Sequence, residues 1–272
     1  MNFFERAVPF VGTLSEETYE YIKADMETAY EMLMERLEVP DSVLEDKKGW
    51  CDVKDYVIYA TIYAKLHSRD IVLTDTGFGV VSNDTIAPAS PVRVNALKEE
   101  LEYRRDFSLE HLIRMCIVTH EWYESAGAKT IESLIWSPNQ VQNYCCGCAE
   151  IGKGKKVTFN TVALLAPKIM AAQQTLERRW GAKLMEVMLQ QTRGKVFEEL
   201  GVVYRSLQEY MIRYISAVVC DLLPYAENML DTIGGYIEGN INYFPEYKDS
   251  PEYEANHYES KGNTPEGKVF FL

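Results

Sequence analysis

Residues 70–101, DIVLTDTGFGVVSNDTIAPASPVRVNALKEEL, decide the organisation of this chain, because helical periodicity stops there and then resumes. Two short β-favouring runs flank a turn-forming triplet: Ile71–Thr74 and Phe78–Val81, with Asp75-Thr76-Gly77 between them. This pattern predicts a small β-hairpin within residues 70–82. We interpret the stretch as a structural landmark and not as a catalytic site.

The end of the same stretch contains a helix start signal. Ser90 is suited to the N-cap, and Pro91 to the first helical position, where its missing N–H costs nothing. Apolar residues then recur at helical spacing as far as Ile117, as one long helix or as two.

Further helices are predicted on both sides of the landmark by the same periodicity and by their caps. Upstream, the first predicted helix runs from Thr13, the start of a capping box, to Leu37. The second is capped by Asp52. Downstream, the first predicted helix is preceded by Pro167 and ends near Gly194. The second runs from Leu207 to Leu222 and is ended or kinked by Pro224. The expected core positions are Leu97, Leu101, Ile169, Leu176, Val187, Met211 and Val218.

The predicted fold class is all-α: a helical bundle with one short hairpin and an irregular C-terminal arm. The predicted organisation is an N-terminal helical module (1–126), an irregular linker (127–157), a second helical module (158–238) and the arm (239–272). The two modules also align weakly at an offset of roughly 155 residues, with Phe4 on Phe159 and Met32–Met34 on Val187–Leu189. Either a duplication or a chance match of amphipathic patterns explains this.

Composition excludes some classes of function. The 272 residues carry a net charge of −13, with a pI near 4.9, which argues against holding nucleic acid by clustered Lys and Arg. An acidic surface suits a protein past which DNA slides, because like charges repel. No signal peptide or membrane-spanning run is visible in the sequence, so we expect a cytoplasmic protein with mostly reduced cysteines.

Several motifs are candidate sites, but the sequence assigns none of them a catalytic, cofactor-binding or metal-binding role. Asp75-Thr76-Gly77 resembles an aspartic-protease loop, but Phe78 follows it and the repeat partner is Asp231-Thr232-Ile233. Cys145-Cys146-Gly147-Cys148 provides C-x-x-C without a nearby second pair, which leaves a metal, a redox dithiol or incidental thiols as alternatives. The remaining candidates are incomplete: Cys116 with His120, His120-Glu121 without a second zincin histidine, Glu254 with His257, and Gly152–Lys156 without P-loop spacing.

The arm is rich in aromatic residues: Tyr236, Tyr243, Phe244, Tyr247, Tyr253, Tyr258, Phe270 and Phe271 lie in or beside it. Disordered tails are usually poor in such residues. We therefore expect the arm to pack, either on its own helical body, the favoured alternative, or on a neighbouring subunit.

Residues Leu73–Ser90 (LTDTGFGVVSNDTIAPAS) with Arg93–Leu97 (RVNAL) resemble an uncharacterised family of virion-associated proteins from phages and prophages of Bacteroides-like bacteria, as does the helix in Phe159–Gly181. The resemblance implies a structural role at the head–tail connection or neck, as a homo-oligomer in the assembled particle and in contact with other virion proteins. We expect no cofactor. It transfers no catalytic residue. The alternative is a helical enzyme or small-ligand-binding protein, in which ionisable groups would converge in a cleft.

Overall fold

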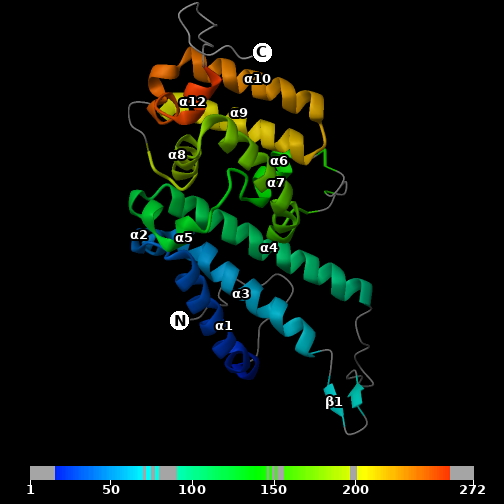
Figure 1. The fold of residues 1–272 in the computed structure, drawn as a ribbon. Coiled ribbons are helices and arrows are strands. Elements are labelled where there is room, and N and C mark those ends of the chain that lie inside the picture. The colour runs from blue at the N-terminus through cyan, green and yellow to red at the C-terminus, as the bar shows by residue number, and fades with distance from the viewer. Residues whose placement is uncertain are drawn as a thin grey trace, which may run out of the picture.

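The computed structural model describes residues 16–69, 72–74, 77–79, 91–145, 147–148, 151, 156–196 and 201–257 (Figure 1). The N-terminal half contains α1 (Glu16–Leu37), α2 (Asp41–Glu45), α3 (Lys47–Arg69), strands β1 (Val72–Thr74) and β2 (Gly77–Gly79), α4 (Pro91–Ile117), the 3₁₀-helix η1 (His120–Glu124) and α5 (Ala126–Lys129). There follow α6 (Pro138–Tyr144), α7 (Phe159–Trp180), α8 (Ala182–Thr192), α9 (Gly201–Val219), α10 (Leu223–Gly239), η2 (Ile241–Tyr243), α11 (Pro245–Lys248) and α12 (Pro251–Asn256). The all-α class is confirmed.

Strands β1 and β2 form a two-stranded antiparallel pair, in which Leu73 lies opposite Phe78. The other residues of the predicted 70–82 hairpin lie outside the described residues. So do Ser90 and Thr13, the two predicted N-caps, although α4 begins at Pro91 and α1 ends at Leu37, as predicted.

The prediction that Asp52 caps the second helix is wrong. Helix α3 begins at Lys47, and the Asp46 carboxylate accepts hydrogen bonds from the backbone N–H groups of Lys48 (2.8 Å) and Gly49 (3.0 Å). These bonds satisfy two of the donors that a helix start leaves unpaired, and they lower the pKa of Asp46. Asp52 lies inside α3, where its carboxylate contacts the His111 ring of α4.

The prediction of one helix from Pro167 to Gly194 is also wrong. Pro167 lies within α7, on its exposed surface, where solvent can satisfy the carbonyl that a proline leaves unpaired. The chain breaks instead at Gly181, whose φ of +89° is a conformation that L side chains rarely adopt. Helix α8 starts afresh after this break. Pro224, by contrast, begins a new helix, α10, as its first-turn residue.

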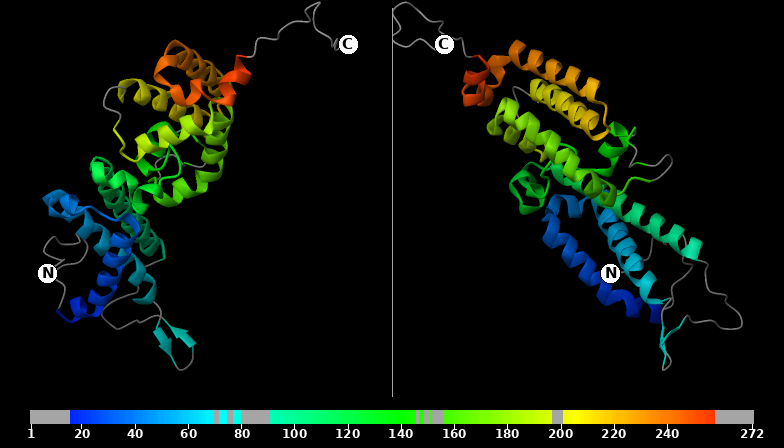
Figure 2. Two further views of the ribbon diagram at one scale, coloured as in Figure 1. Left: turned by 60° about the vertical axis from the view of Figure 1, so that its left-hand side comes forward. Right: turned by 45° about the vertical axis from the view of Figure 1, so that its right-hand side comes forward.

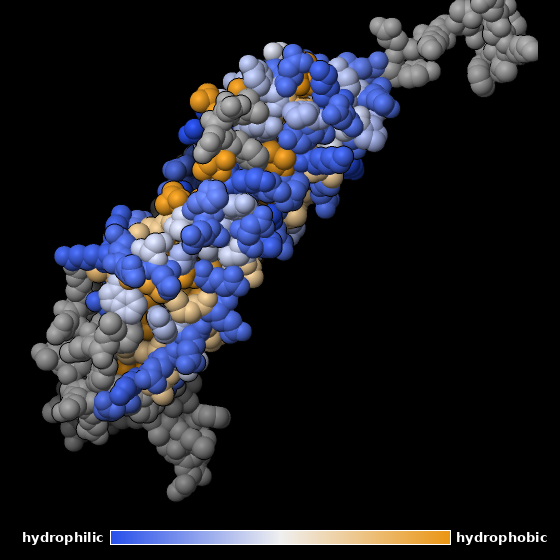
Figure 3. All heavy atoms as spheres, turned by 90° about the vertical axis from the view of Figure 1, so that its left-hand side faces the viewer, coloured by the Kyte–Doolittle hydropathy of each residue, from blue (hydrophilic) through white to orange (hydrophobic). Residues whose placement is uncertain are grey.

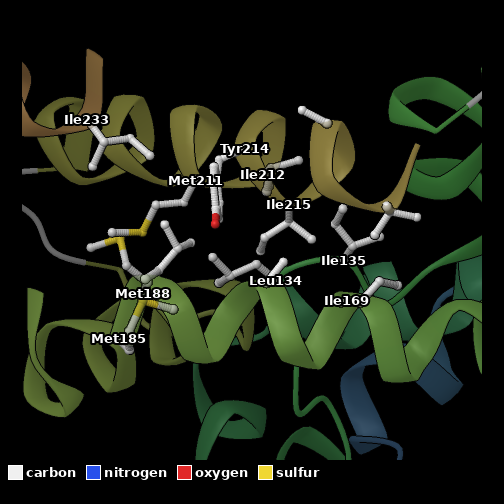
Figure 4. Close-up of a cluster of buried hydrophobic side chains, with 14 of the residues drawn as sticks. Leu134, Ile135, Ile169, Met185, Met188, Met211, Ile212, Tyr214, Ile215 and Ile233 are labelled. Atoms are coloured by element: carbon white, nitrogen blue, oxygen red, sulfur yellow. The ribbon is translucent and has the colours of Figure 1, made fainter. Parts of the chain in front are cut away.

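The helices form an elongated stack, with α1 and α3 at one end, α4 across the middle, and α7 to α10 towards the other end (Figures 1 and 2). The N-terminal core lies between α1, α3 and α4 and includes Leu37, Val53, Leu112 and Trp122. The C-terminal core lies between α7, α8, α9 and α10. In Figure 4, Met185 and Met188 of α8 point towards Met211 of α9 in this second core.

Four of the seven predicted core positions are buried: Leu101, Ile169, Leu176 and Met211. Leu97, Val187 and Val218 are only partly buried. Val187 and Val218 pack at the margin of the C-terminal core. Leu97 lies in the N-terminal part of α4.

The segment predicted as an irregular linker, 127–157, contains α6 and supplies buried side chains to the C-terminal core, among them Leu134, Ile135 and Val141. The arm is not irregular as far as His257, because α11 and α12 lie within it. Phe244 and Tyr247 are buried in the core of their own chain, and the Phe244 ring meets Tyr204 edge-on at 5.4 Å. Self-packing, the favoured alternative, is thus observed for this part of the arm.

Candidate functional site

Three cysteine side chains converge at one end of the C-terminal core. Cys145 and Cys148 follow α6, and Cys220 follows α9, 72 residues beyond Cys148. The three Sγ atoms lie within 4.8 Å of one another, and the Cys148 and Cys220 sulfurs are 2.6 Å apart. The missing partner of the C-x-x-C motif is therefore a single distant cysteine and not a second pair. Cys146 lies outside the described residues.

The end of α6, the turn that follows it and the end of α9 position the three thiols. The Cys145 N–H donates to the Val141 carbonyl at 2.9 Å, which closes α6, and the Cys148 N–H donates back to the Cys145 carbonyl at 2.9 Å. Helix α9 ends in a Schellman motif, in which Leu222 N–H donates to Ala217 and Asp221 N–H to Val218, with Asp221 at φ +57°. Cys220 is thus fixed by its own helix terminus.

Burial keeps the Cys145 thiol protonated in the absence of a cation. Cys145 is fully buried, and this burial raises its pKa to about 12. The neighbouring Cys220 raises it further, while a hydrogen bond with Ser216 acts in the opposite direction. The Ser216 hydroxyl also donates to the Tyr144 carbonyl, so α9 and α6 are joined beside the cysteines. A thiol in this setting is a poor nucleophile.

A second feature is a hollow of about 390 Å³ between α4, α6 and residues 156–157. Its lining residues include Tyr103, Phe107, Glu110, His111, Arg114, Gln142 and Lys156. The charged groups here are engaged in structural pairs. Glu110 accepts from Arg114 at 2.7 Å and from the Asn139 N–H of α6 at 3.0 Å, and His111 is paired with Asp52. These pairs hold α4 against α3 and α6.

The other sequence candidates do not assemble into sites among the residues that the structure describes. Cys116 is buried in the N-terminal core, where burial raises its pKa to about 12, whereas His120 is exposed and meets the Tyr123 ring edge-on. Thr232, from the supposed repeat of the protease motif, is exposed and donates to its own helix at Asn228.

The remaining candidates have ordinary surface partners or lie outside the description. The His257 ring lies 3.2 Å from the Glu238 carboxylate and stacks on the Tyr253 ring. Its contacts are therefore with these two residues and not with Glu254 of the motif. Lys156 pairs with Glu100. Asp75, Thr76 and residues 152–155 are outside the described residues.

Comparison with known proteins gives a match to a family model. A family model described as a family of unknown function (DUF6712) matches residues 52–130, from α3 to just beyond α5. No curated protein and no protein of solved structure matches the chain. Within the described ranges, no helix has the length and apolar content needed to cross a membrane. The chain is therefore similar, over residues 52–130, to a family whose description names no activity.

Proposed function

We propose that this chain is a structural or assembly protein of a phage or prophage particle, at the head–tail connection, which acts through contacts with copies of itself and with other virion proteins. The phage assignment is based on the resemblance of residues Leu73–Ser90 and Arg93–Leu97. That run lies inside the 52–130 range matched by the family model.

The observation that carries the proposal is a set of large apolar side chains exposed in two separate regions. The first region, here called the turn patch, comprises Leu164 (78% exposed), Leu222 (52%) and Leu223 (61%). An ion pair of 3.4 Å joins Lys168, one helical turn after Leu164, to Asp221, which precedes Leu222. The turn patch is therefore formed by α7 and the α9–α10 turn together.

The second region, here called the α4-end patch, comprises Val118 (83% exposed) and Val196 (69%). Its two sides are held together because Gly194 lies against the Ile117 backbone carbonyl, so close that a Cβ there would sit 2.0 Å from the oxygen. Figure 3 shows that, on the face it presents, apolar side chains interrupt a mainly hydrophilic surface.

The two patches differ in composition and lie towards opposite ends of α9. Its 19 residues span about 28 Å at 1.5 Å per residue. Two unlike surfaces on one chain suit a head-to-tail contact between copies, which closes into a ring when the rotation allows. The net charge of −13 suits such a ring around DNA, because it disfavours adhesion to the phosphates.

Light scattering after size exclusion, over a range of concentrations, tests self-association. We expect a concentration-dependent rise in mass and rings in negative-stain images. Leu222→Ser with Leu223→Ser should abolish both, whereas Met32→Ser, an equally polar change at a 65%-exposed position on α1, should not. A monomer at every concentration, or wild-type assembly by the double variant, would overturn the head-to-tail contact.

The virion assignment needs its own test. Mass spectrometry of particles purified after prophage induction should detect this chain at a stoichiometry of one ring per particle. Its consistent absence from complete particles would refute the assignment.

The alternative function, a helical enzyme or ligand-binding protein, is favoured only by the hollow between α4 and α6. A small molecule that raises the melting temperature of the wild type but not of Phe107→Ala would support it. Phe107 lines the hollow and is 62% exposed, so its truncation should cost little stability.

A further inference from the structure

We infer that Cys145, Cys148 and Cys220 form a binding site for a thiophilic divalent cation, Zn²⁺, held by three thiolates. The site does not depend on the proposed virion function.

The ligand set fits the chemistry of zinc. Zinc prefers thiolates at about 2.3 Å in tetrahedral geometry, so its ligand sulfurs lie about 3.8 Å apart. The three Sγ atoms already lie within 4.8 Å of one another, and they come from the end of α6, the loop after it and the end of α9. To surround one ion, the Cys148 and Cys220 sulfurs, now 2.6 Å apart, must move about 1.2 Å further from each other, which side-chain rotation can supply.

A cation would also supply the positive charge that these buried sulfurs lack. Binding converts three S–H groups into three Zn–S bonds, so the thiol protons pass to solvent as the ion exchanges water ligands for sulfur. Three thiolates and one Zn²⁺ leave a net charge of −1. Ser216, which is hydrogen bonded to Cys145, would orient that ligand.

The arrangement leaves a fourth coordination position beyond these three ligands. Cys145 and Cys148 are buried, whereas Cys220 is partly exposed. That position can therefore be filled from the solvent side, near Cys220. The bound ion would join the loop after α6 to the end of α9, two segments 72 residues apart in sequence.

The test uses the full-length chain, purified with reductant, loaded with Zn²⁺ and passed through a desalting column. Elemental analysis should give one zinc per chain, and Co²⁺ in its place should give the intense thiolate-to-cobalt charge-transfer absorption. Cys220→Ser and Cys148→Ser should lose most of the zinc and weaken that absorption. Cys51→Ser, which changes a partly exposed cysteine of α3 outside the cluster, should keep both.

Circular dichroism of each variant establishes that it is folded, so that loss of metal is not confused with unfolding. Addition of EDTA should lower the melting temperature of the wild type but not of Cys220→Ser. Three results would overturn the site: folded wild type without zinc or cobalt absorption, full zinc content in Cys220→Ser, or a Cys148–Cys220 disulfide in place of metal in non-reducing peptide maps.

Discussion

Asp106 connects the two cores, and its removal should destabilise the protein strongly. The residue lies on α4, is 1% exposed, and accepts a 2.7 Å hydrogen bond from the backbone N–H of Phe159, the first residue of α7. Its other oxygen accepts from the Arg105 guanidinium at 2.7 and 2.9 Å. Phe159 in turn packs against the N-terminal core. One carboxylate thus fixes the start of α7 to α4.

The size of the effect follows from these contacts. A hydrogen bond to a charged group contributes about 1.5–3 kcal/mol. A carboxylate at a helix N-terminus adds up to about 2 kcal/mol when partly buried. Arg105 keeps a second partner, the Glu102 carboxylate at 3.8 Å, so the loss of its pairing with Asp106 adds little to the free-energy cost. We therefore expect Asp106→Ala to lower the free energy of unfolding by about 3 kcal/mol, and Asp106→Asn, which keeps an acceptor for Phe159, by roughly half of that.

Urea denaturation followed by circular dichroism measures this change as a lower midpoint at unchanged slope. The control is Glu124→Ala, which removes an exposed ion pair with Lys129 at 3.9 Å and should cost less than about 0.5 kcal/mol. If Asp106→Ala stays within that same range, the carboxylate does not hold α7 to α4.

Three further predictions concern packing and pH. Phe244→Ala should cost about 3–5 kcal/mol in urea unfolding, because the ring is fully buried in the arm; a wild-type midpoint would show that the arm does not support the core. Leu176→Ala should cost about 2–5 kcal/mol for the same reason, and a change under 1 kcal/mol would place it outside the core. Hydrogen bonds, first from Lys156, lower the pKa of Glu100 below its ordinary 4.5. Its contribution to folding stability is therefore present above about pH 4.5 and is lost as the pH falls through the lowered pKa. Glu100→Gln should reduce this loss of stability at acid pH in thermal melts, and an unaltered pH profile would contradict the prediction.

Local pattern was sufficient for the fold class and for several element boundaries. Helical periodicity indicated an all-α protein because an amphipathic helix repeats its apolar residues along one face. Pro91 marked the start of α4, since a first-turn proline loses no hydrogen bond. Where two residues offered the same local chemistry, the pattern was ambiguous. Asp46 and Asp52 can each cap a helix, and a helix may either contain Pro167 or begin beside it.

Only the tertiary structure decided which distant residues meet. The sequence by itself determined that Cys145 and Cys148 share a loop and that Asp106 lies on a helix. The structure placed Cys220 beside the first two and set Asp106 against Phe159, 53 residues further along the chain. The break at Gly181 and the burial of Phe244 were decided in the same way. The physical reason is that periodicity fixes which face of each helix is apolar, whereas the packing of side chains fixes which helices those faces meet and at what angle.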